Sequence, residues 1–538
     1  MTPIRRLLVA NRGEIAVRVF RACRELGIET VAVVAPDDHG SLHARSADQT
    51  IEIAGYLRPE EHVRAARQSG ADAIHPGYGF LAESADFAEA VEAAGLTFVG
   101  PTPEALRAGG DKLRAKEIAR EAGVPVVEMG EPSDVGYPLM IKAAGGGGGR
   151  GMRLIRTAED LEAGLAAARR EAKAAFGDDT VFCERYVERP RHVEIQILAD
   201  THGTVIALGE RDCSIQRRHQ KVLEEAPSPA LDPALRAQMS EAAVRFAQAI
   251  GYRSAGTAEF MLSGRDFYFL ELNGRIQVEH PVTELVTGVD LVQAQLRLAN
   301  GARIEAAPEL RGHAVEVRLY AEDPRTFLPQ VGRIERLELP RNVRVDAGVE
   351  AGVEVGTAYD PMIAKLIAHA PTRSEAFSRL GAALHHTIVT GVTTNLPFLR
   401  WLAAHPAVRS GDVTTAFLEE HPPLSLLPVC AVDAPWRLPW RLNLPSAAPL
   451  PPLDPDTAAQ TGASGSGQSV LSAPMPGTVL RVLVAEGDRV GARQPLVILE
   501  AMKMETPIAS PYEALVERVH VREGDRVAGG APLVELAG

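Results

Sequence analysis

The chain has 538 residues, of which 46% are hydrophobic and 24% are charged, so it is long enough for three or four globular domains. Its net charge of −13 and its isoelectric point near 5.7, with no long Lys/Arg run, argue against nucleic acid or an anionic membrane as the main partner. The four cysteines are far apart, the N-terminal apolar run is too short for a signal peptide, and no stretch approaches the ~20 apolar residues of a membrane span, so we expect a cytoplasmic protein without a membrane partner.

Residues 1–110 show the alternation that is typical of a doubly wound α/β domain. Apolar runs predict strands at 4–10, at 28–35, up to residue 74 and at 96–99, and the spacing between them predicts helices at 14–27, 60–69 and 84–94. In open sheets of this type ligands bind at the carboxyl ends of the strands, where residues 11–13 and 75–80 would lie. Ordinary strand-to-helix turns explain any single residue there about as well.

A run of five glycines, 145–149, lies between predicted strands at 139–143 and 152–155. The run lacks the Gly-Lys-Ser/Thr ending of a P-loop, so we expect the loop of a hairpin instead. Backbone without side chains can bring several N–H donors against phosphate oxygens and can close as a lid, and Lys142 just before it would add a positive charge. A mobile surface loop explains the run nearly as well.

Two carboxylates are expected to face each other across a second hairpin. Glu259 and Glu271 lie in β-like runs at 257–262 and 267–273, and a hairpin centred on residue 265 places them opposite each other, with Asn273 on the same face as Glu271. Three oxygen ligands without His or Cys suit Mg²⁺ or Mn²⁺. The alternative is a solvated strand face whose charges lie apart.

Two charged segments accompany this hairpin. Arg275 and Glu279, four residues apart in the loop after it, offer an anion clamp and a base. Upstream, residues 211–221 form a dense cluster of cationic and amide side chains, which taken alone would be a solvated charged face.

Together these segments resemble biotin carboxylase and its ATP-grasp domain. The resemblance rests on residues 75–80, the glycine lid, and residues 190–196, 211–221, 277–283 and 311–314, and it covers about 1–430. One departure is Gly274, where related sequences usually carry Thr, Ser or Pro, and we expect it to loosen the loop that holds Arg275. The resemblance implies an N-terminal α/β domain at 1–110, an ATP-grasp domain with a glycine-rich lid at 111–311 and an α+β C-terminal domain at 312–430.

The resemblance also implies roles for individual residues. Glu279 would deprotonate bicarbonate, Arg275 and the backbone of Val278 would hold that anion, Lys221 would add charge beside the γ-phosphate, and Arg318 would bind biotin and stabilise its anion. Glu259, Glu271 and Asn273 would hold Mg²⁺ or Mn²⁺. The residues that would bind ATP are Lys112, Lys142, Gly148, Gly149, Glu184, Arg185, Tyr186, Val187, His192, His219, Glu259 and Glu271. The implied reaction converts MgATP and bicarbonate to ADP and carboxyphosphate, which carboxylates biotin.

The C-terminal part begins with a linker and ends in an internal repeat. Residues 431–468 are rich in Pro and Ala and then in Gly and Ser, which predicts a tether that spans tens of Å. Residues 486–490 recur at 523–527, which predicts two similar halves that form an all-β flattened barrel at 469–538. Lys503 falls between the halves, where we expect it at a hairpin tip.

The repeat and the Ala-Met-Lys-Met sequence at 501–504 resemble the biotinyl carrier domain, which implies biotin in amide linkage to Lys503. A lipoyl domain has the same general shape, but its lysine usually lies beside an acidic residue. The resemblance further implies biotin protein ligase, a separate carboxyltransferase subunit that acts on acyl-CoA, and a homodimer or larger hetero-oligomer, with Arg18 near the dimer contact. The alternatives are a subunit of a split pyruvate carboxylase and a carrier scaffold that has lost catalysis.

Overall fold

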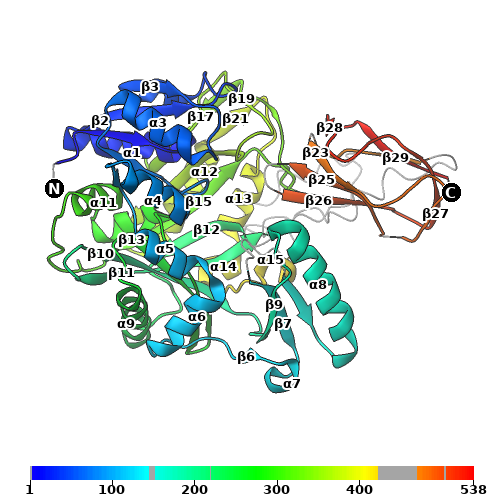
Figure 1. The fold of residues 1–538 in the computed structure, drawn as a ribbon, viewed down its shortest axis with the longest axis horizontal. Helices are drawn as coiled ribbons and strands as arrows, with labels where there is room; N and C mark the ends of the chain where they lie inside the picture. The colour runs from blue at the N-terminus through cyan, green and yellow to red at the C-terminus, as the bar shows by residue number, and fades with distance from the viewer. Residues whose placement is uncertain are drawn as a thin grey trace, which may run out of the picture.

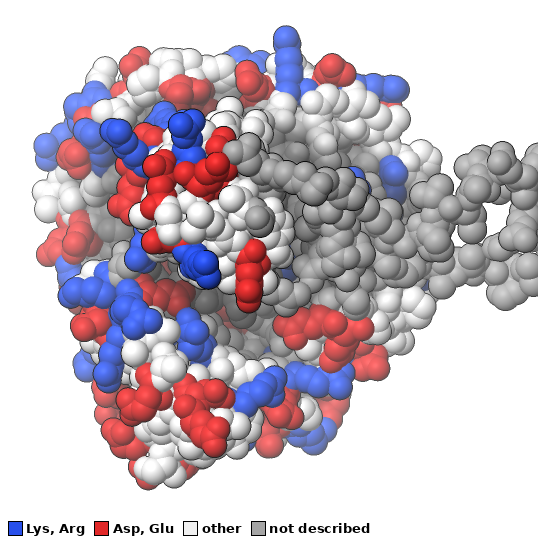
Figure 2. Space-filling view, turned by 90° about the vertical axis from the view of Figure 1, so that its right-hand side faces the viewer, with Lys and Arg blue, Asp and Glu red and all other residues white. Residues whose placement is uncertain are grey.

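The computed structural model describes residues 3–144, 152–217, 220–421, 469–475, 477–492, 494–501 and 504–537, and the side chains of all of these except 174–176, 469 and 501–506. Up to residue 421 the described residues form both helices and strands, whereas the elements after 468 are strands (Figure 1). On the face shown in Figure 2, Lys and Arg side chains lie among Asp and Glu side chains. Among the described helices, none combines the length and the apolar character needed to cross a membrane.

The N-terminal segment forms the doubly wound α/β fold that the sequence predicts. Its five strands are parallel and lie in the order β3-β2-β1-β4-β5. Leu7 and Val9 of the central strand belong to one buried cluster and Leu8 to another, so the sheet is covered on both faces. The elements are β1 (Arg6–Val9), α1 (Gly13–Leu26), β2 (Glu29–Val34), α2 (Leu42–Ser46), β3 (Gln49–Glu52), α3 (Pro59–Ser69), β4 (Ala73–His75), α4 (Ala85–Ala93), β5 (Thr97–Phe98) and α5 (Pro103–Gly110).

The loops after β1 and β4 meet at the carboxyl edge of this sheet, as predicted. Asn11 Nδ2 donates hydrogen bonds to the carbonyl oxygens of Pro76 and Tyr78, each at 2.8 Å. Gly77, with φ of 65°, lies so close to Asn11 that a Cβ at Gly77 would meet Asn11 Nδ2 at 2.8 Å. Glycine at position 77 therefore permits the close approach of the two loops.

The segment with the glycine run forms a separate four-stranded sheet, β6-β9-β7-β8. Strands β7 and β8 have the bounds predicted from the sequence and pair in antiparallel fashion, with Leu139 opposite Ile155 and Lys142 opposite Met152. Residues 145–151, which join them, lie outside the described residues. The elements are α6 (Lys112–Glu121), β6 (Met129–Gly130), α7 (Pro132–Val135), β7 (Leu139–Ala143), β8 (Met152–Ile155), η1 (Ala158–Asp160), α8 (Leu161–Phe176) and β9 (Val181–Arg185).

The largest sheet has eight strands in the order β14-β13-β10-β11-β12-β15-β20-β18. The sheet contains strands from both sides of the predicted domain boundary at residue 311. Strand β12 pairs with β15, with Leu223 opposite Val317 and Glu224 opposite Glu316. A sheet shared between the segments before and after residue 311 is not predicted from the sequence. Its strands and the neighbouring helices are β10 (Arg191–Ala199), β11 (Val205–Arg217), β12 (Gln220–Ala226), α9 (Pro233–Ala249), β13 (Ser254–Ser263), β14 (Asp266–Asn273), α10 (His280–Thr287), α11 (Leu291–Ala299), β15 (His313–Tyr320), β18 (Arg344–Ala347) and β20 (Met362–Ala370).

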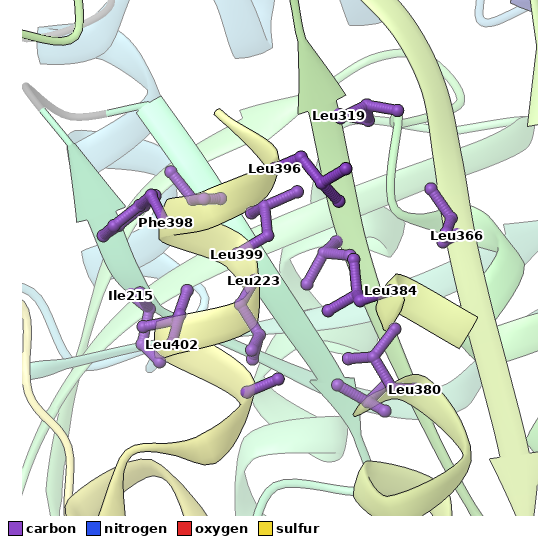
Figure 3. Close-up of a cluster of buried hydrophobic side chains, with 14 of the residues drawn as sticks. Ile215, Leu223, Leu319, Leu366, Leu380, Leu384, Leu396, Phe398, Leu399 and Leu402 are labelled. Atoms are coloured by element: carbon purple, nitrogen blue, oxygen red, sulfur yellow. The ribbon is translucent and has the colours of Figure 1, made fainter. Parts of the chain in front are cut away.

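Two helices cover the C-terminal part of this sheet. Helix α12 (Arg373–His386) contributes Leu380 and Leu384, and helix α13 (Leu396–Ala404) contributes Leu399, to a cluster that includes Leu223 and Leu319 from the strands (Figure 3). In α12, Leu380 and Leu384 are four residues apart, and in α13, Leu399 is three residues from Leu396 and from Leu402, so the leucines lie on one face of each helix. The remaining elements before residue 422 are β16 (Gly332–Arg333), β17 (Arg336–Glu338), β19 (Glu354–Val355), β21 (Ile388–Thr390), α14 (Pro406–Ser410) and α15 (Phe417–Glu420).

The C-terminal strands form two four-stranded sheets, β22-β29-β27-β24 and β26-β25-β23-β28, around their own apolar cluster. The repeat relates β23 to β27 and β24 to β28, and the equivalent strands lie in opposite sheets. The turns match as well, since Gly487 N–H donates to Val516 and Gly524 N–H donates to Val479. The predicted all-β flattened barrel is therefore confirmed. The strands are β22 (Ser469–Ser472), β23 (Gly477–Val482), β24 (Arg489–Val490), β25 (Pro495–Ala501), β26 (Met504–Ala509), β27 (Ala514–Val519), β28 (Arg526–Val527) and β29 (Pro532–Ala537).

Candidate active site

The three predicted metal ligands lie together on the β13–β14 hairpin. Glu259 and Glu271 are direct cross-strand partners, and Asn273 pairs with Thr257 further along. A one-residue bulge at Leu270 shifts the register toward the turn but leaves this pair aligned. Asn273 Nδ2 donates to Glu259 Oε1 at 2.9 Å. The hairpin therefore gathers three oxygen-bearing side chains, as the sequence predicts.

Lys221 lies at the centre of the charged residues. Its Nζ donates to three carboxylates, at 2.5 Å to Glu194 Oε2, 2.8 Å to Glu259 Oε1 and 2.7 Å to Glu279 Oε1. An ammonium has three N–H donors, so all of them are used. Burial alone would lower the pKa of Lys221, but the three carboxylates raise it well above its usual value. Lys221 is therefore a cation at any working pH.

Glu279 is the predicted base, and it is held between two cations. Its Oε1 accepts from Lys221, and its Oε2 accepts from Arg318 Nη2 at 3.0 Å. Burial opposes ionisation, yet Lys221 and Arg318 hold the pKa of Glu279 well below its usual range. Glu279 is thus an ionised carboxylate with only 2% of its surface exposed, in the unprotonated form that a base requires.

Arg318, on β15, is shared between two carboxylates. Its Nε donates to Glu224 Oε1 at 2.6 Å, and its Nη2 reaches Glu279. Burial raises the pKa of Glu224 to about 7, against the attraction of Arg318. Near neutral pH, Glu224 is therefore ionised only in part, so the ionised Glu279 is the main counter-ion of Arg318.

Arg275, the predicted anion clamp, is fixed by a residue that the sequence analysis did not single out. Its Nε donates to Glu83 Oε2 at 2.9 Å and its Nη2 to Asn273 Oδ1 at 2.9 Å. The other oxygen of Glu83 accepts from the N–H of Gly274 at 3.1 Å. A Cβ at Gly274 would meet Leu106 Cδ2 at 2.8 Å. The glycine therefore lets the loop pack against Leu106, while the expectation that Gly274 loosens the loop stays a prediction.

Arg211 belongs to the 211–221 cluster but is completely buried, so the interpretation as a solvated face is wrong for this residue. Its guanidinium fills all five donor positions. The acceptors are Glu194 Oε1 (2.5 Å), Gln196 Oε1 (2.7 Å), Thr283 Oγ1 (2.9 Å), Thr257 Oγ1 (3.1 Å) and Gln277 Oε1 (3.1 Å). Arg211 thus ties β10, β13 and the loop before α10 together beneath the site.

The lysines predicted to bind ATP lie beside acidic partners. Lys112 Nζ is 3.1 Å from Glu271 Oε2, and Lys142 Nζ is 2.6 Å from Glu184 Oε2. Lys116, which the sequence analysis missed, pairs with the other oxygen of Glu184 and is 2% exposed. Burial, with Lys112 nearby, lowers the pKa of Lys142 to about 8, and burial with both neighbours lowers that of Lys116 to about 6. Near neutral pH the amine of Lys116 is therefore mostly neutral, and Lys112 and Lys142 supply the positive charge suited to phosphate.

The other residues predicted to bind ATP lie at the end of β9, just after it, or on β10. Arg185 Nη2 donates to the Tyr268 hydroxyl at 3.0 Å, and Tyr186 N–H donates to the Pro138 carbonyl at 3.1 Å. Val187 is buried. His192 Nε2 is 2.9 Å from Glu259 Oε2, and although burial opposes it, this carboxylate raises the pKa of His192. The predicted Gly148, Gly149, His219 and Lys503 lie outside the described residues.

The donor set fits a hard divalent cation. Burial would raise the pKa of Glu259, but Lys221 and His192 hold it well below its usual value, so this carboxylate is anionic. Glu271, opposite it, is about one-third exposed and can turn to a ligand. Carboxylate and amide oxygens are the ligands that Mg²⁺ and Mn²⁺ prefer, and such ions complete their shell with water and nucleotide phosphate. The site therefore combines places for a metal, for phosphate, for an oxyanion and for a base.

Family models match four segments of the chain. They are described as "Biotin carboxylase, N-terminal domain" at residues 3–106, "Carbamoyl-phosphate synthase L chain, ATP binding domain" at 111–307, "Biotin carboxylase C-terminal domain" at 316–420 and "Biotin-requiring enzyme" at 469–536.

Individual relatives match over 78% of the chain. A biotin carboxylase from Halalkalibacterium halodurans is 47% identical, with 98% of its length covered. The propionyl-CoA carboxylase alpha chain of Ruegeria pomeroyi is 48% identical, with 68% covered. Among solved structures, the biotin carboxylase domain dimer of 2-oxoglutarate carboxylase from Hydrogenobacter thermophilus, in complex with MgADP, ADP and bicarbonate, matches with a TM-score of 0.76 at 44% identity over 78% of this chain and 98% of that one.

Proposed function

Because this chain belongs to the biotin carboxylase family and ends in a domain of the biotin-requiring type, we propose that it uses ATP and bicarbonate to carboxylate biotin attached to Lys503 and supplies a separate carboxyltransferase subunit that acts on an acyl-CoA. The chain is a fusion of biotin carboxylase with a biotinyl carrier. The observation that carries the proposal is the ionised, buried Glu279 between Lys221 and Arg318, next to the carboxylate hairpin.

The first step is the activation of bicarbonate. Arg275 and the N–H of Val278 hold the anion, and Glu279 takes its proton. A bicarbonate oxygen then attacks the γ-phosphorus of ATP, the bond to the bridging oxygen breaks, and ADP leaves, which gives carboxyphosphate. Lys221 lies beside Glu279 and places positive charge where the bicarbonate and phosphate oxygens meet.

The nucleotide and the metal would be held by the residues around the hairpin. Glu259, Glu271 and Asn273 would hold Mg²⁺ or Mn²⁺, which would neutralise phosphate oxygens. Further ATP contacts come from Lys112, Lys142, Glu184, Arg185, Tyr186, Val187, His192, Gly148, Gly149 and His219. The positive charge of Lys112 and Lys142 supports the placement of phosphate near Lys142.

The second step would transfer the carboxyl group of carboxyphosphate to biotin: the bond between the carboxyl carbon and the phosphate oxygen would break, the leaving phosphate would take the proton of the ureido nitrogen, and this nitrogen would bond to the carboxyl carbon. Arg318 would bind the ureido oxygen and stabilise the negative charge that develops there. Its position 3.0 Å from Glu279 supports this role, because the acceptor would then lie next to the site where bicarbonate is activated.

The assembly follows from the same proposal. We propose domains at 1–110, 111–311, 312–430 and 469–538 with the linker at 431–468, biotin protein ligase as the enzyme that modifies Lys503, and a cytoplasmic homodimer that binds carboxyltransferase subunits. The described cysteines are free thiols, which supports a reducing compartment. Arg18 is 2% exposed and pairs with Glu284 and Asp290 at 2.8 Å each, so its part in a dimer would be to position these carboxylates.

The test compares free biotin with attached biotin. Wild-type protein should release ADP in a bicarbonate-dependent way with free biotin, and Lys503→Arg should keep that activity while it loses streptavidin binding and transfer to acyl-CoA. Correctly folded protein without ADP release would support the scaffold alternative. Purification of the native complex, followed by assays with a panel of acyl-CoA substrates and pyruvate, identifies the acceptor.

A further inference from the structure

A buried lysine outside the set described above touches the backbone of the bicarbonate loop. Lys365 lies on β20 opposite Arg318 of β15 and is 0% exposed. Its Nζ donates to the carbonyl oxygen of Val278 at 2.7 Å. A hydrogen bond from a charged donor in a buried place is stronger than one between neutral groups, so this contact is a firm constraint on the loop.

The carbonyl of Val278 directly precedes the predicted base, Glu279. The carbonyl of Val278 and the N–H of Glu279 belong to one planar peptide unit, so a fixed carbonyl also fixes where the backbone of Glu279 begins. The preceding carbonyl, of Gln277, accepts from His280 Nδ1 at 2.7 Å. Burial lowers the pKa of His280 well below its usual value, so this ring is neutral. Lys365 is thus the charged one of two side chains that hold consecutive carbonyls beside the base.

Lys365 also reaches the N-terminal domain. Its Nζ is 3.2 Å from Glu14 Oε1, and the same oxygen accepts from the hydroxyl of Tyr78, in the loop that follows β4. Glu14 is 5% exposed, and its other oxygen has no hydrogen-bond partner among the described residues. A buried carboxylate needs a cation, and Lys365 is the one beside it.

The backbones meet closely at the same place. A Cβ at Gly348, which follows β18, would meet Glu14 N at 2.5 Å. The N-terminus of α1 therefore lies directly against the C-terminal part of the large sheet, and Lys365 cannot follow a displacement of Glu14 without releasing Val278. Residues from two other segments of the chain, Val278 and Glu14, contact this one ammonium group.

We propose that Lys365 is a positioning residue for the carboxylation reaction: through the carbonyl of Val278 it aligns Glu279 with Lys221 and Arg318, and through Glu14 it couples this alignment to Tyr78. This inference rests on the proposed function. Lys365 touches neither nucleotide phosphate nor biotin in the proposed reaction, and its effect passes through the loop backbone.

The test uses Lys365→Met, which keeps the length of the side chain and removes the ammonium, together with Glu14→Gln and the double variant. For Lys365→Met we expect kcat/KM for bicarbonate to fall roughly 10- to 100-fold, the loss of one buried charged hydrogen bond. The dissociation constant for MgADP, measured by calorimetry, should not change. The Tm of Lys365→Met should fall, because Glu14 loses its cation. Lys173→Met, at an exposed lysine on α8, is the matched control and should behave as wild type.

The double variant separates positioning from stability. Because the Glu14→Gln substitution replaces one of the two carboxylates near Lys365 with a neutral amide, and Asp346 opposite Lys365 keeps its charge, the double variant should recover part of the lost Tm while its kcat/KM for bicarbonate stays low. Recovery of the bicarbonate kinetics together with Tm would overturn the positioning role, and so would an equal loss of MgADP affinity in Lys365→Met. An assay of the wild-type protein tests the proposed function separately. ADP release that does not depend on bicarbonate would overturn that function. Activity of Lys365→Met equal to that of an active wild type would overturn the role of Lys365 alone.

Discussion

Replacement of Arg211 by lysine should destabilise the large sheet although it keeps the positive charge. The guanidinium donates five hydrogen bonds in a place with no exposed surface, and a lysine ammonium can donate at most three. At least two acceptors would then be left without a partner. A buried polar group without a hydrogen bond costs about 1–3 kcal/mol, so Arg211→Lys should lose about 2–6 kcal/mol of stability.

Thermal unfolding measures this loss. With an unfolding entropy of about 2.1 cal/mol/K per residue, 1 kcal/mol corresponds to about 1 °C in Tm for a body of roughly 420 residues, so its transition should move down by about 2–7 °C. The acceptors belong to Glu194, Gln196, Thr257, Gln277 and Thr283, and loosening them should also lower kcat with free biotin, because Glu194 is one of the three partners of Lys221.

The matched control is Arg265→Lys. Arg265 is exposed and pairs with Asp232 at 2.5 Å on the surface, where water replaces lost contacts, so this variant should melt with the wild type. If Arg211→Lys also melted with the wild type, the five contacts would not contribute to stability, and the claim that Arg211 ties the strands together would be refuted.

Three further predictions concern the base, the metal site and pH. Glu279→Gln should lower kcat with free biotin by about 10²- to 10⁴-fold without a change in nucleotide affinity, and wild-type kcat would exclude Glu279 as the base. Glu271→Gln should raise the Mg²⁺ concentration needed for half-maximal activity, measured at fixed ATP, and an unchanged Mg²⁺ dependence would remove Glu271 from the metal site. Burial lowers the pKa of His75 to about 4, and its Nδ1 accepts from the N–H of Gly77 at 3.0 Å. As the pH falls, His75 therefore binds a proton in the unfolded chain, near pH 6.5, before it does so in the folded chain, near pH 4. The neutral, buried His75 thus contributes about 3 kcal/mol to the free energy of unfolding above pH about 6.5, and this contribution is lost as the pH falls toward 4. Tm measured from pH 8 to 4 should fall more steeply for wild type than for His75→Gln.

Local patterns in the sequence predicted the elements around the site. Strands β7 and β8 have their predicted bounds because each is a short apolar run beside the glycines. The pairing of Glu259 with Glu271 follows from a short turn, in which few registers are possible. The internal repeat predicted two equivalent halves, and the equivalent strands do lie in opposite sheets. The roles of the site residues stay predictions.

Contacts between distant segments could not be predicted in this way. Arg211 lies in a run of charged residues, and no periodicity shows that its partners, up to 72 residues away, would close over it. Glu83 and Arg275 are 192 residues apart, and Lys365 is 87 residues from Val278. Each contact forms only when segments far apart in the sequence pack together, so a single sequence holds no local signal for it.

The hydrogen bonds between β12 and β15 have a consequence for how the chain can be divided. A fragment that stops at residue 311 would leave β12 as an edge strand with one side unpaired and would expose the apolar face around Leu223, which favours aggregation. A cut at this point for grafting or gene fusion would therefore divide one sheet, although one family model ends at 307 and the next begins at 316. The strands from 469 to 537 enclose their own apolar cluster, so this part can be transplanted onto another protein without cutting a sheet.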